Sequence, residues 1–370
     1  MAKLLTALGL MSGTSMDGID VALIRTDGER QVERGPSRSF AYDVEMRDRL
    51  KVALAEAAAL EERTQRPGSL AAVEKEITER HAAAVAAFLE ETGTETGALD
   101  VIGFHGQTVL HRPEARLTVQ LGDAALLARL TGCEVVSDLR AADVAAGGEG
   151  APLASVYHRA LASGLPQRPV VFVNIGGVAN VTWIGGEEEI LAFDTGPGNA
   201  LMDDWTARHT GRSCDENGEL ARSGTADEAV LRRYLAQPFF ARPVPKSLDR
   251  GDFTLEFVNG LDAATGAATL ARVTAGAIAL SRAWFKAPAA LWVICGGGRR
   301  NRFLMELLAW HLDAPVVPAE AIGADGDSLE AEAWGYLAVR SLKGLPITFP
   351  TTTGGPRAMM GGVRHGPNPQ

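Results

Sequence analysis

The same succession of secondary structure is predicted twice along this 370-residue chain. In the first half, apolar runs at Leu4–Leu10 and Ile19–Ile24 flank a loop rich in Gly, Ser and Asp, which predicts a β-hairpin followed by alternating helices and strands. In the second half, strands predicted at Pro169–Asn174, Val178–Ile184 and Ile190–Phe193 open a similar succession. No repeat aligns residue by residue, so only the pattern recurs. It predicts an α/β chain of two lobes, each a mixed sheet flanked by helices, with a ligand cleft between them.

The bulk composition fits two globular domains and argues against some functions. Hydrophobic residues make up 46% and charged residues 22%, enough apolar material for two cores. The net charge of −10 argues against a nucleic-acid partner, but it allows ATP held by backbone N–H groups and a metal ion. The three cysteines lie far apart, as in proteins of a reducing compartment. No apolar run reaches the roughly 18 residues of a membrane span, so we expect a cytoplasmic protein with no membrane partner.

The loop within Ser12–Asp20 has the composition of a phosphate-binding loop. Its small residues let backbone N–H groups converge on phosphate oxygens, and Thr14 and Ser15 add hydroxyl donors. Asp17 or Asp20 could hold Mg²⁺ directly or through water. An ordinary hairpin turn built on the Asp-Gly pair explains the same residues, and this loop alone leaves both interpretations open.

Two more glycine loops occur in the second half. Asn174–Asn180 contains two consecutive glycines, which suit a tight hairpin, but a hairpin leaves both Asn side chains without a role. Asp194–Asn199 places a carboxylate at a strand end, followed by Gly-Pro-Gly and Asn leading into a helix. Asn199 alone could be a helix cap. A cap does not require Asp194 five residues earlier, so the pattern favours a functional site.

The fourth glycine loop, Cys295–Asn301, lies between a predicted strand and a predicted helix. Three consecutive glycines cost chain entropy and are reasonable where a flat group such as adenine lies on the backbone. The spacing does not match the dinucleotide fingerprint GxGxxG, and the chain contains no GxxxxGK[ST] phosphate loop.

Seven stretches in order resemble the anhydro-N-acetylmuramic acid kinase family, within the sugar kinase–actin–heat-shock ATPase superfamily. They are Gly9–Asp20, Gly103–Val109, Val119–Asp123, Gly147–Leu153, Asn174–Asn180, Phe193–Asn199 and Cys295–Gly298. The resemblance implies two ribonuclease-H-like lobes around an ATP-binding cleft. It places the phosphate-binding hairpin loop in residues 1–140, and the catalytic Asp loop and adenosine-binding Gly loop in 141–370. It also implies an amino-sugar substrate, ATP and Mg²⁺, a homodimer, and a role in peptidoglycan recycling.

The resemblance and the loops assign roles to single residues. Asp194 and Glu330 are the expected catalytic carboxylates, with the neighbouring Glu332 an open alternative to Glu330. The expected substrate-binding residues are His105, Gln107, Gly196 and Asn199. The expected cofactor-binding residues are Gly13, Thr14, Ser15, Met16, Asp17, Gly18, Ile19, Asp20, Gly176, Gly177, Asn180, Gly296, Gly297, Gly298 and Asn301. Asp17 and Asp20 are also the candidate metal ligands.

The implied substrate carries a bridge between C1 and O6, and this bridge determines the chemistry. Opening it requires a base that activates water at C1. The departing O6 can be captured by the γ-phosphorus of ATP, so one carboxylate suffices, and Asp194 is expected to be that base. The alternatives are a kinase of the same superfamily acting on a different sugar hydroxyl, a non-catalytic ATP-driven clamp, and a glycosidase without ATP. The glycine loops count against the glycosidase, and the two carboxylates count against the clamp.

Overall fold

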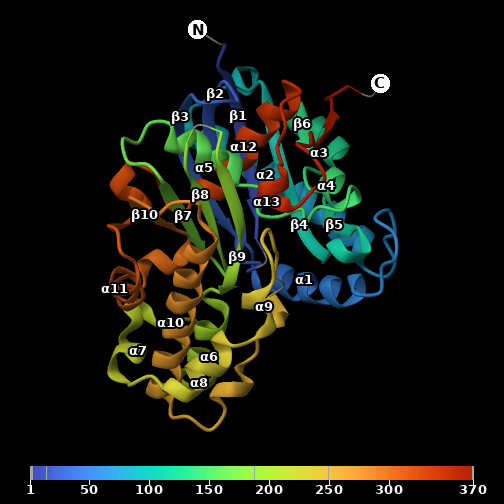
Figure 1. Cartoon of the computed structure of the whole chain (residues 1–370). Helices are drawn as coiled ribbons and strands as arrows, with labels where there is room; N and C mark the ends of the chain where they lie inside the picture. The colour runs from blue at the N-terminus through green and yellow to red at the C-terminus, as the bar shows by residue number, and fades with distance from the viewer. Residues whose placement is uncertain (1–2, 14, 187, 249, 369–370) are drawn as a thin grey trace. The chain divides into compact units, whose positions relative to one another are not determined.

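The computed structural model describes residues 3–368 except 14, 187 and 249. Their contacts divide the chain into two compact units (Figure 1). The first unit comprises the described residues of Met1–Ser163 and Glu330–Gln370, and the second those of Gly164–Leu329. The chain therefore leaves the first unit once and returns to it at the start of helix α12 (Leu329–Leu342).

A seven-stranded mixed sheet forms the centre of the first unit. Strands β1, β2 and β3 form an antiparallel meander, β4 runs parallel to β1, and β6 runs parallel to β4. Strand β5 pairs with β4, and β12 pairs with β6, both antiparallel. The strands are β1 (Leu5–Ser12), β2 (Gly18–Thr26), β3 (Val32–Ala41), β4 (Val101–Arg112), β5 (Leu117–Leu121), β6 (Val135–Ser137) and β12 (Val363–His365).

Alternate residues of the central strands face different helices, because successive side chains of a strand point to opposite faces. Leu8 and Leu10 of β1 lie in a core with α1 (Val44–Ala57), α2 (Leu70–Thr92) and α3 (Ala124–Thr131). The intervening Gly9 faces α12. The first unit also contains α4 (Ala141–Ala145), α5 (Ser155–Ala162) and α13 (Pro350–Thr353).

The second unit is built on a five-stranded sheet in the order β11-β10-β7-β8-β9. Strands β7, β8 and β9 form an antiparallel meander, while β10 runs parallel to β7 and β11 runs parallel to β10. The strands are β7 (Val170–Ile175), β8 (Val178–Ile184), β9 (Ile190–Pro197), β10 (Leu291–Cys295) and β11 (Val316–Pro318). The helices are α6 (Ala200–Thr210), α7 (Glu219–Ser223), α8 (Glu228–Leu235), α9 (Pro238–Ala241), α10 (Ala263–Leu280) and α11 (Arg302–His311).

Helix α10 is the central core helix of the second unit (Figure 1). Together with the following turn it forms a stretch, Ala263–Trp284, that is long and apolar enough to cross a membrane by length and composition. In the structure 67% of its most apolar window is buried. Its apolar character is therefore accounted for by packing against the sheet and the neighbouring helices.

Both sheets have the same core order, in which three antiparallel strands are followed by two parallel strands added beside the first. This is the strand order of the ribonuclease H fold, and it occurs as β3-β2-β1-β4-β6 and as β9-β8-β7-β10-β11. The prediction of two mixed α/β lobes flanked by helices is confirmed, whereas the ATP-binding cleft stays a prediction.

The structure corrects the lobe boundary expected at residue 140. Helices α4 and α5 group with the first unit, and so do the residues from Glu330 to the end of the described chain. The tail falls within the range 141–370 expected for the second lobe, but β12 pairs with β6 of the first sheet. This pairing joins residues more than 200 positions apart, for example Val363 with Ser137, and local patterns carry no sign of it.

Two site motifs lie inside strands. His105 and Gln107 lie within strand β4, which continues to Arg112. Strand β9 continues to Pro197, so Asp194 lies inside a strand and not in a loop beyond its end.

Candidate active site

The hairpin loop between β1 and β2 is shorter than expected. Gly13 and Ser15–Asp17 form the described part of the turn, while Gly18, Ile19 and Asp20 belong to β2. Thr14, an expected phosphate ligand, lies outside the described residues. Ile19 is buried in the core of the first sheet, so its side chain packs there. The exposed part of the predicted phosphate loop is therefore centred on Ser15, Met16 and Asp17.

The turn is held by hydrogen bonds within itself. The N–H of Met16, which has a φ of 56°, donates to the carbonyl of Gly13 at 3.1 Å. The hydroxyl of Ser15 donates to Oδ1 of Asp17 at 2.7 Å. The left-handed backbone at Met16 turns the chain tightly. The loop is thus a compact turn whose shape is fixed by its own hydrogen bonds.

Buried polar side chains support the loop from below. Gln107 accepts from the Ser12 hydroxyl at 2.6 Å and donates to the Gly13 carbonyl at 3.1 Å. The Tyr42 hydroxyl lies 3.1 Å from the Ser12 hydroxyl, and the Tyr42 N–H donates to the carbonyl of Asp17 at 2.9 Å. Burial raises the pKa of Tyr42 to about 12, so it stays a neutral hydroxyl. Gln107 was expected to bind substrate, and these contacts make it a support of the loop. Tyr42 was not anticipated.

His105 is another buried side chain that holds this hairpin loop in place. Its Nε2 accepts from the Arg140 guanidinium at 3.3 Å, which leaves Nδ1 to donate to the carbonyl of Ser12 at 3.1 Å. Its ring centroid lies 4.6 Å from that of Trp334. Burial, and then the Arg140 charge, hold the pKa of His105 well below its usual 6.5. His105 is therefore neutral at physiological pH and cannot act there as a cationic acid.

The two candidate metal ligands differ in their surroundings. Asp20 is partly buried, and its Oδ1 accepts from the Ser39 hydroxyl of β3 at 2.5 Å. Asp17 is exposed on the turn. Among residues 3–368 without 14, 187 and 249, no group of three or more His, Cys, Asp or Glu could hold a metal by itself. The donor set fits Mg²⁺ only where phosphate oxygens complete its coordination, a usual arrangement for this ion.

In the second unit, three polar residues lie in a row across three strands. Asn174 of β7 pairs with Asn180 of β8, and Asn180 pairs with Asp194 of β9. Residues directly opposite in a sheet point to the same face. The two Asn side chains that a simple hairpin left unexplained are thus aligned with the expected catalytic carboxylate.

Asp194 is 7% exposed and is held at both its backbone and its carboxylate. Its N–H donates to the carbonyl of Lys246 at 2.9 Å. Its Oδ2 accepts from the N–H of Leu248 at 2.8 Å. A backbone N–H favours the ionised form of a carboxylate, the form that a general base needs.

The three glycine loops of the second unit meet in one place. The N–H of Gly198 donates to the carbonyl of Gly177 at 2.9 Å, and the N–H of Asn199 donates to that of Gly176 at 2.7 Å. Gly296 has a φ of 72°, and a Cβ there would clash with the Asn174 side chain and the Ile175 backbone. The loops at 174–177, 196–199 and 296–298, which are far apart in sequence, therefore meet, and their partly or fully exposed glycines, Gly176, Gly177, Gly296 and Gly297, form a glycine-lined surface.

Two residues of the fourth loop have structural partners. Asn301, expected to bind the cofactor, is the N-cap of α11, and its side chain accepts from the N–H of Leu304 at 3.0 Å. The Arg299 side chain is 6% exposed and donates to the carbonyl of Gly296 at 3.0 Å and to both carboxylate oxygens of Asp327. The bond with Asp327 raises the pKa of Arg299, so its charge is permanent. Arg299, which the sequence did not single out, fixes the shape of this loop.

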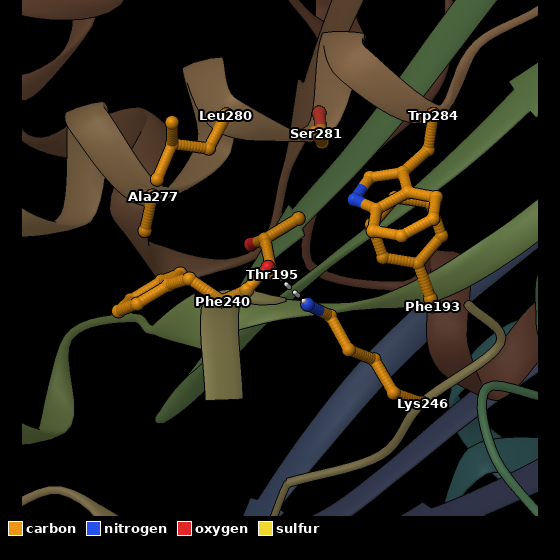
Figure 2. A pocket seen from close by; sticks show the side chains of 8 residues that line it. All are labelled: Phe193, Thr195, Phe240, Lys246, Ala277, Leu280, Ser281 and Trp284. Carbon is orange, nitrogen blue, oxygen red and sulfur yellow. Dashed lines mark hydrogen bonds between the residues drawn. The ribbon is translucent and has the colours of Figure 1, made fainter. Parts of the chain in front are cut away.

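Gly196, expected near the substrate, follows Asp194 by two residues in β9 and packs against Ala277 and Phe240. A small cavity of about 10 Å³ lies beside it (Figure 2). The cavity is lined by Phe193, Thr195, Phe240, Lys246, Ala277, Leu280, Ser281 and Trp284. It is too small for a sugar, so this face of β9 is packed.

The two carboxylates at the start of α12 are clearly distinguished by burial. Glu332 is 2% exposed, and its Oε2 accepts from the Tyr157 hydroxyl at 2.5 Å. Burial and this carboxylate raise the pKa of Tyr157 well above 10. Glu330 lies in the first turn and is exposed. Glu332 is thus part of the packing of the first unit, while Glu330 is accessible to a ligand.

Comparison with known proteins identifies the class. The sequence model of the family described as "Anhydro-N-acetylmuramic acid kinase" matches residues 5–366. The chain belongs to this family, and it is therefore a kinase.

Curated relatives carry the same description. The protein of Rhodospirillum rubrum named anhydro-N-acetylmuramic acid kinase is 53% identical over 362 residues, which cover 96% of this chain and 93% of that protein. The one of Rhizobium etli is 53% identical over 361 residues, covering 97% and 98%. Among solved structures, the activator of the 2-hydroxyisocaproyl-CoA dehydratase from Clostridium difficile with bound ADPNP matches 92% of this chain and 96% of its own, with 11% identity and a TM-score of 0.46.

Proposed function

We propose that this kinase uses ATP and Mg²⁺ to open 1,6-anhydro-N-acetylmuramic acid with water and to phosphorylate O6, giving N-acetylmuramic acid 6-phosphate and ADP. The observation that carries the proposal is the position of Asp194, next to the glycine-lined surface and in a row with Asn174 and Asn180. The names of relatives about half identical to the chain support the substrate. We further propose that the enzyme works in the cytoplasm, in the recycling of peptidoglycan fragments.

Asp194 is the proposed general base. It takes a proton from the water whose oxygen attacks C1 of the sugar. The C1–O6 bond breaks, O6 forms a bond to the γ-phosphorus, and the bond between that phosphorus and the β–γ bridging oxygen breaks, releasing ADP. The departing O6 needs no separate acid, because phosphorus accepts its electron pair. A positioned base of this kind contributes roughly 10²–10⁴ in rate.

Two sets of residues are proposed to hold the nucleotide. The turn at Gly13–Asp17 offers backbone N–H groups to phosphate oxygens, and its supports Gln107 and His105 keep it in one shape. The glycine-lined surface around Gly176 and Gly297, which are both partly or fully exposed, is suited to a flat base because it lacks side chains. Bound Mg²⁺ neutralises charge on the phosphates, and Asp17 is the carboxylate best exposed to hold it.

A coupled ADP-release assay with and without the anhydro-sugar tests the proposal. We expect ADP release to rise at least tenfold above the sugar-free rate when the anhydro-sugar is added. Free N-acetylmuramic acid should be a much poorer acceptor. If the free sugar is preferred, the chain is an ordinary hydroxyl kinase, and if neither sugar changes the rate, the substrate assignment is wrong.

A further inference from the structure

Lys246 is a buried lysine whose ammonium binds two backbone carbonyls. The residue is 4% exposed, and its Nζ donates to the carbonyls of Phe239 at 2.8 Å and Phe240 at 3.2 Å. Nζ also lies 4.5 Å from the centroid of the Phe239 ring. Figure 2 shows this nitrogen pointing toward Thr195 and Phe240 at the edge of the small cavity. The ammonium therefore binds the end of the short helix α9 (Pro238–Ala241).

The setting explains why a charge is tolerated in this place. The last carbonyls of a helix lack partners within the helix and attract cations. Burial first, and then the charge of Arg242, lower the pKa of Lys246 from 10.5 to about 8. The side chain is thus still mainly an ammonium at neutral pH. Replacing it with an apolar group would take the ammonium donor from the Phe240 carbonyl and leave the Phe239 carbonyl with the N–H of Arg242.

The backbone around Lys246 holds Asp194. The Lys246 carbonyl accepts from the Asp194 N–H at 2.9 Å, and two residues later the Leu248 N–H donates to Oδ2 of Asp194 at 2.8 Å. The side chain of Lys246 and its main chain therefore connect α9 with the carboxylate of Asp194.

Helix α9 is itself fixed against the strand that carries Asp194. The rings of Phe239, Phe240 and Phe253 pack edge to face, with centroids 5.6 to 5.9 Å apart. Phe240 also packs over Gly196, two residues after Asp194. A segment that is bonded to α9 is consequently also held in position relative to β9.

We propose that Lys246 is a positioning residue for Asp194: its ammonium fastens the 246–248 segment to α9, and this segment aims the carboxylate. The inference rests on the proposed role of Asp194 as base. It predicts a specific kinetic defect, since misplacing a catalytic group by about 1 Å can cost on the order of 10² in rate.

Lys246→Met tests the inference because it keeps the length of the side chain and removes the ammonium. We expect kcat to fall about 10²-fold, while the KM of both substrates and the calorimetric Kd of ATP change by less than about threefold. The matched control is Lys286→Met. That lysine is 75% exposed, pairs with Glu189 in the same unit, and should leave kcat unchanged. In a crystal structure of Lys246→Met, the Leu248 N to Asp194 Oδ2 distance should exceed about 3.5 Å.

Two outcomes would overturn the inference. One is a folded Lys246→Met enzyme with kcat within twofold of wild type, and the other is a loss of ATP affinity in step with kcat, which would indicate general damage. If Lys246→Met does not fold, Lys246→Gln replaces the ammonium with a neutral amide on a side chain one bond shorter, so the charged anchor is lost, and a folded Gln variant with wild-type kcat overturns the inference equally. Failure of the proposed function is separate, because it appears in the wild-type enzyme as the absence of sugar-dependent ADP release.

Discussion

Gly103 of β4 lies directly against the carbonyl oxygen of Trp334 on α12. A Cβ at position 103 would come closer than 3.0 Å to this oxygen, a distance that real Cβ atoms essentially never show. Gly9, paired with Gly103 in the parallel ladder, meets the carbonyl of Ala331 in the same way. The helix that carries Glu330 therefore rests on the backbone of the first sheet, and glycine is required beneath it.

Gly103→Ala should consequently destabilise the protein, because neither the strand nor the helix backbone can move away cheaply. We expect a loss of about 3 kcal/mol in the free energy of unfolding, at the upper end for an overpacked core. Urea titration followed by circular dichroism measures it. The control is Gly97→Ala, where a Cβ would meet nothing within 4 Å. Equal stability of the two variants would contradict the close approach of α12.

Replacing Asp194 with Asn should remove the base and keep the shape. We expect kcat to fall by roughly 10²–10⁴, with the Kd of ATP within about threefold of wild type. The Asn side chain can still accept from the N–H of Leu248 through its carbonyl oxygen, so the fold should be preserved. Steady-state kinetics and calorimetry check the two halves of this prediction. Full activity of Asp194→Asn would exclude this residue from the mechanism.

Oxygen labelling tests the bond that water forms. If water attacks C1, turnover in ¹⁸O-water places the label on O1 of the product and leaves the phosphate unlabelled. Mass spectrometry of the sugar phosphate and of its phosphate group distinguishes the positions. Label found in the phosphate would show attack at phosphorus and reject the scheme.

Glu330 and Glu332 make a matched pair, because the same substitution should have opposite consequences. Glu332 is buried and bonded to Tyr157, so Glu332→Gln should lower the free energy of unfolding by about 1–3 kcal/mol. Glu330 is exposed, so Glu330→Gln should leave stability nearly unchanged and lower kcat. Thermal unfolding and the ADP-release assay separate the two effects. If Glu332→Gln is the stable but inactive variant, the assignment is reversed.

The sequence predicted those features that depend on neighbouring residues. The hairpin around Gly13–Asp17, the meander β7–β9 and the strand before Gly296 follow from alternation and turn residues, and the structure has all three. The glycine loops were recognised one by one. Their convergence into one surface was not visible, because it depends on the strand order β10-β7-β8-β9.

The features that sequence reasoning missed depend on distant partners. Asn301 is an exception: its role as the N-cap of α11 is local and could be predicted from the sequence, but the neighbouring glycines favoured a cofactor-binding role. Lys246 and Tyr42 had no recognisable motif, since their functions arise only from contacts with α9 and with Ser12. Strand β9 also continues through Asp194 into the Gly-Pro-Gly sequence, although glycine and proline usually favour turns. Pairing with β8 stabilises this extended conformation.

Three buried histidines should make the fold sensitive to acid. Burial lowers the pKa of His81 to about 4 and of His158 to about 3, and that of His105 lies well below 6.5. Each is neutral in the folded protein, whereas the unfolded chain binds a proton below about pH 6.5. The unfolded state thus binds more protons in this range, so stability is unaffected above pH 6.5 and is lost as the pH falls from 6.5 toward these lowered values.

Each histidine contributes up to ~1.4 kcal/mol per pH unit to that loss. His81→Leu should therefore reduce the slope of unfolding free energy between pH 6 and 4.5 by about this amount, because leucine does not titrate. The carboxylates that also titrate there are common to both proteins and cancel in the difference. Urea titrations of the wild type, His81→Leu and the exposed control His209→Gln measure the slopes. An unchanged slope in His81→Leu, with a changed slope in His209→Gln, would mean that the acid sensitivity comes from the surface and not from the buried rings.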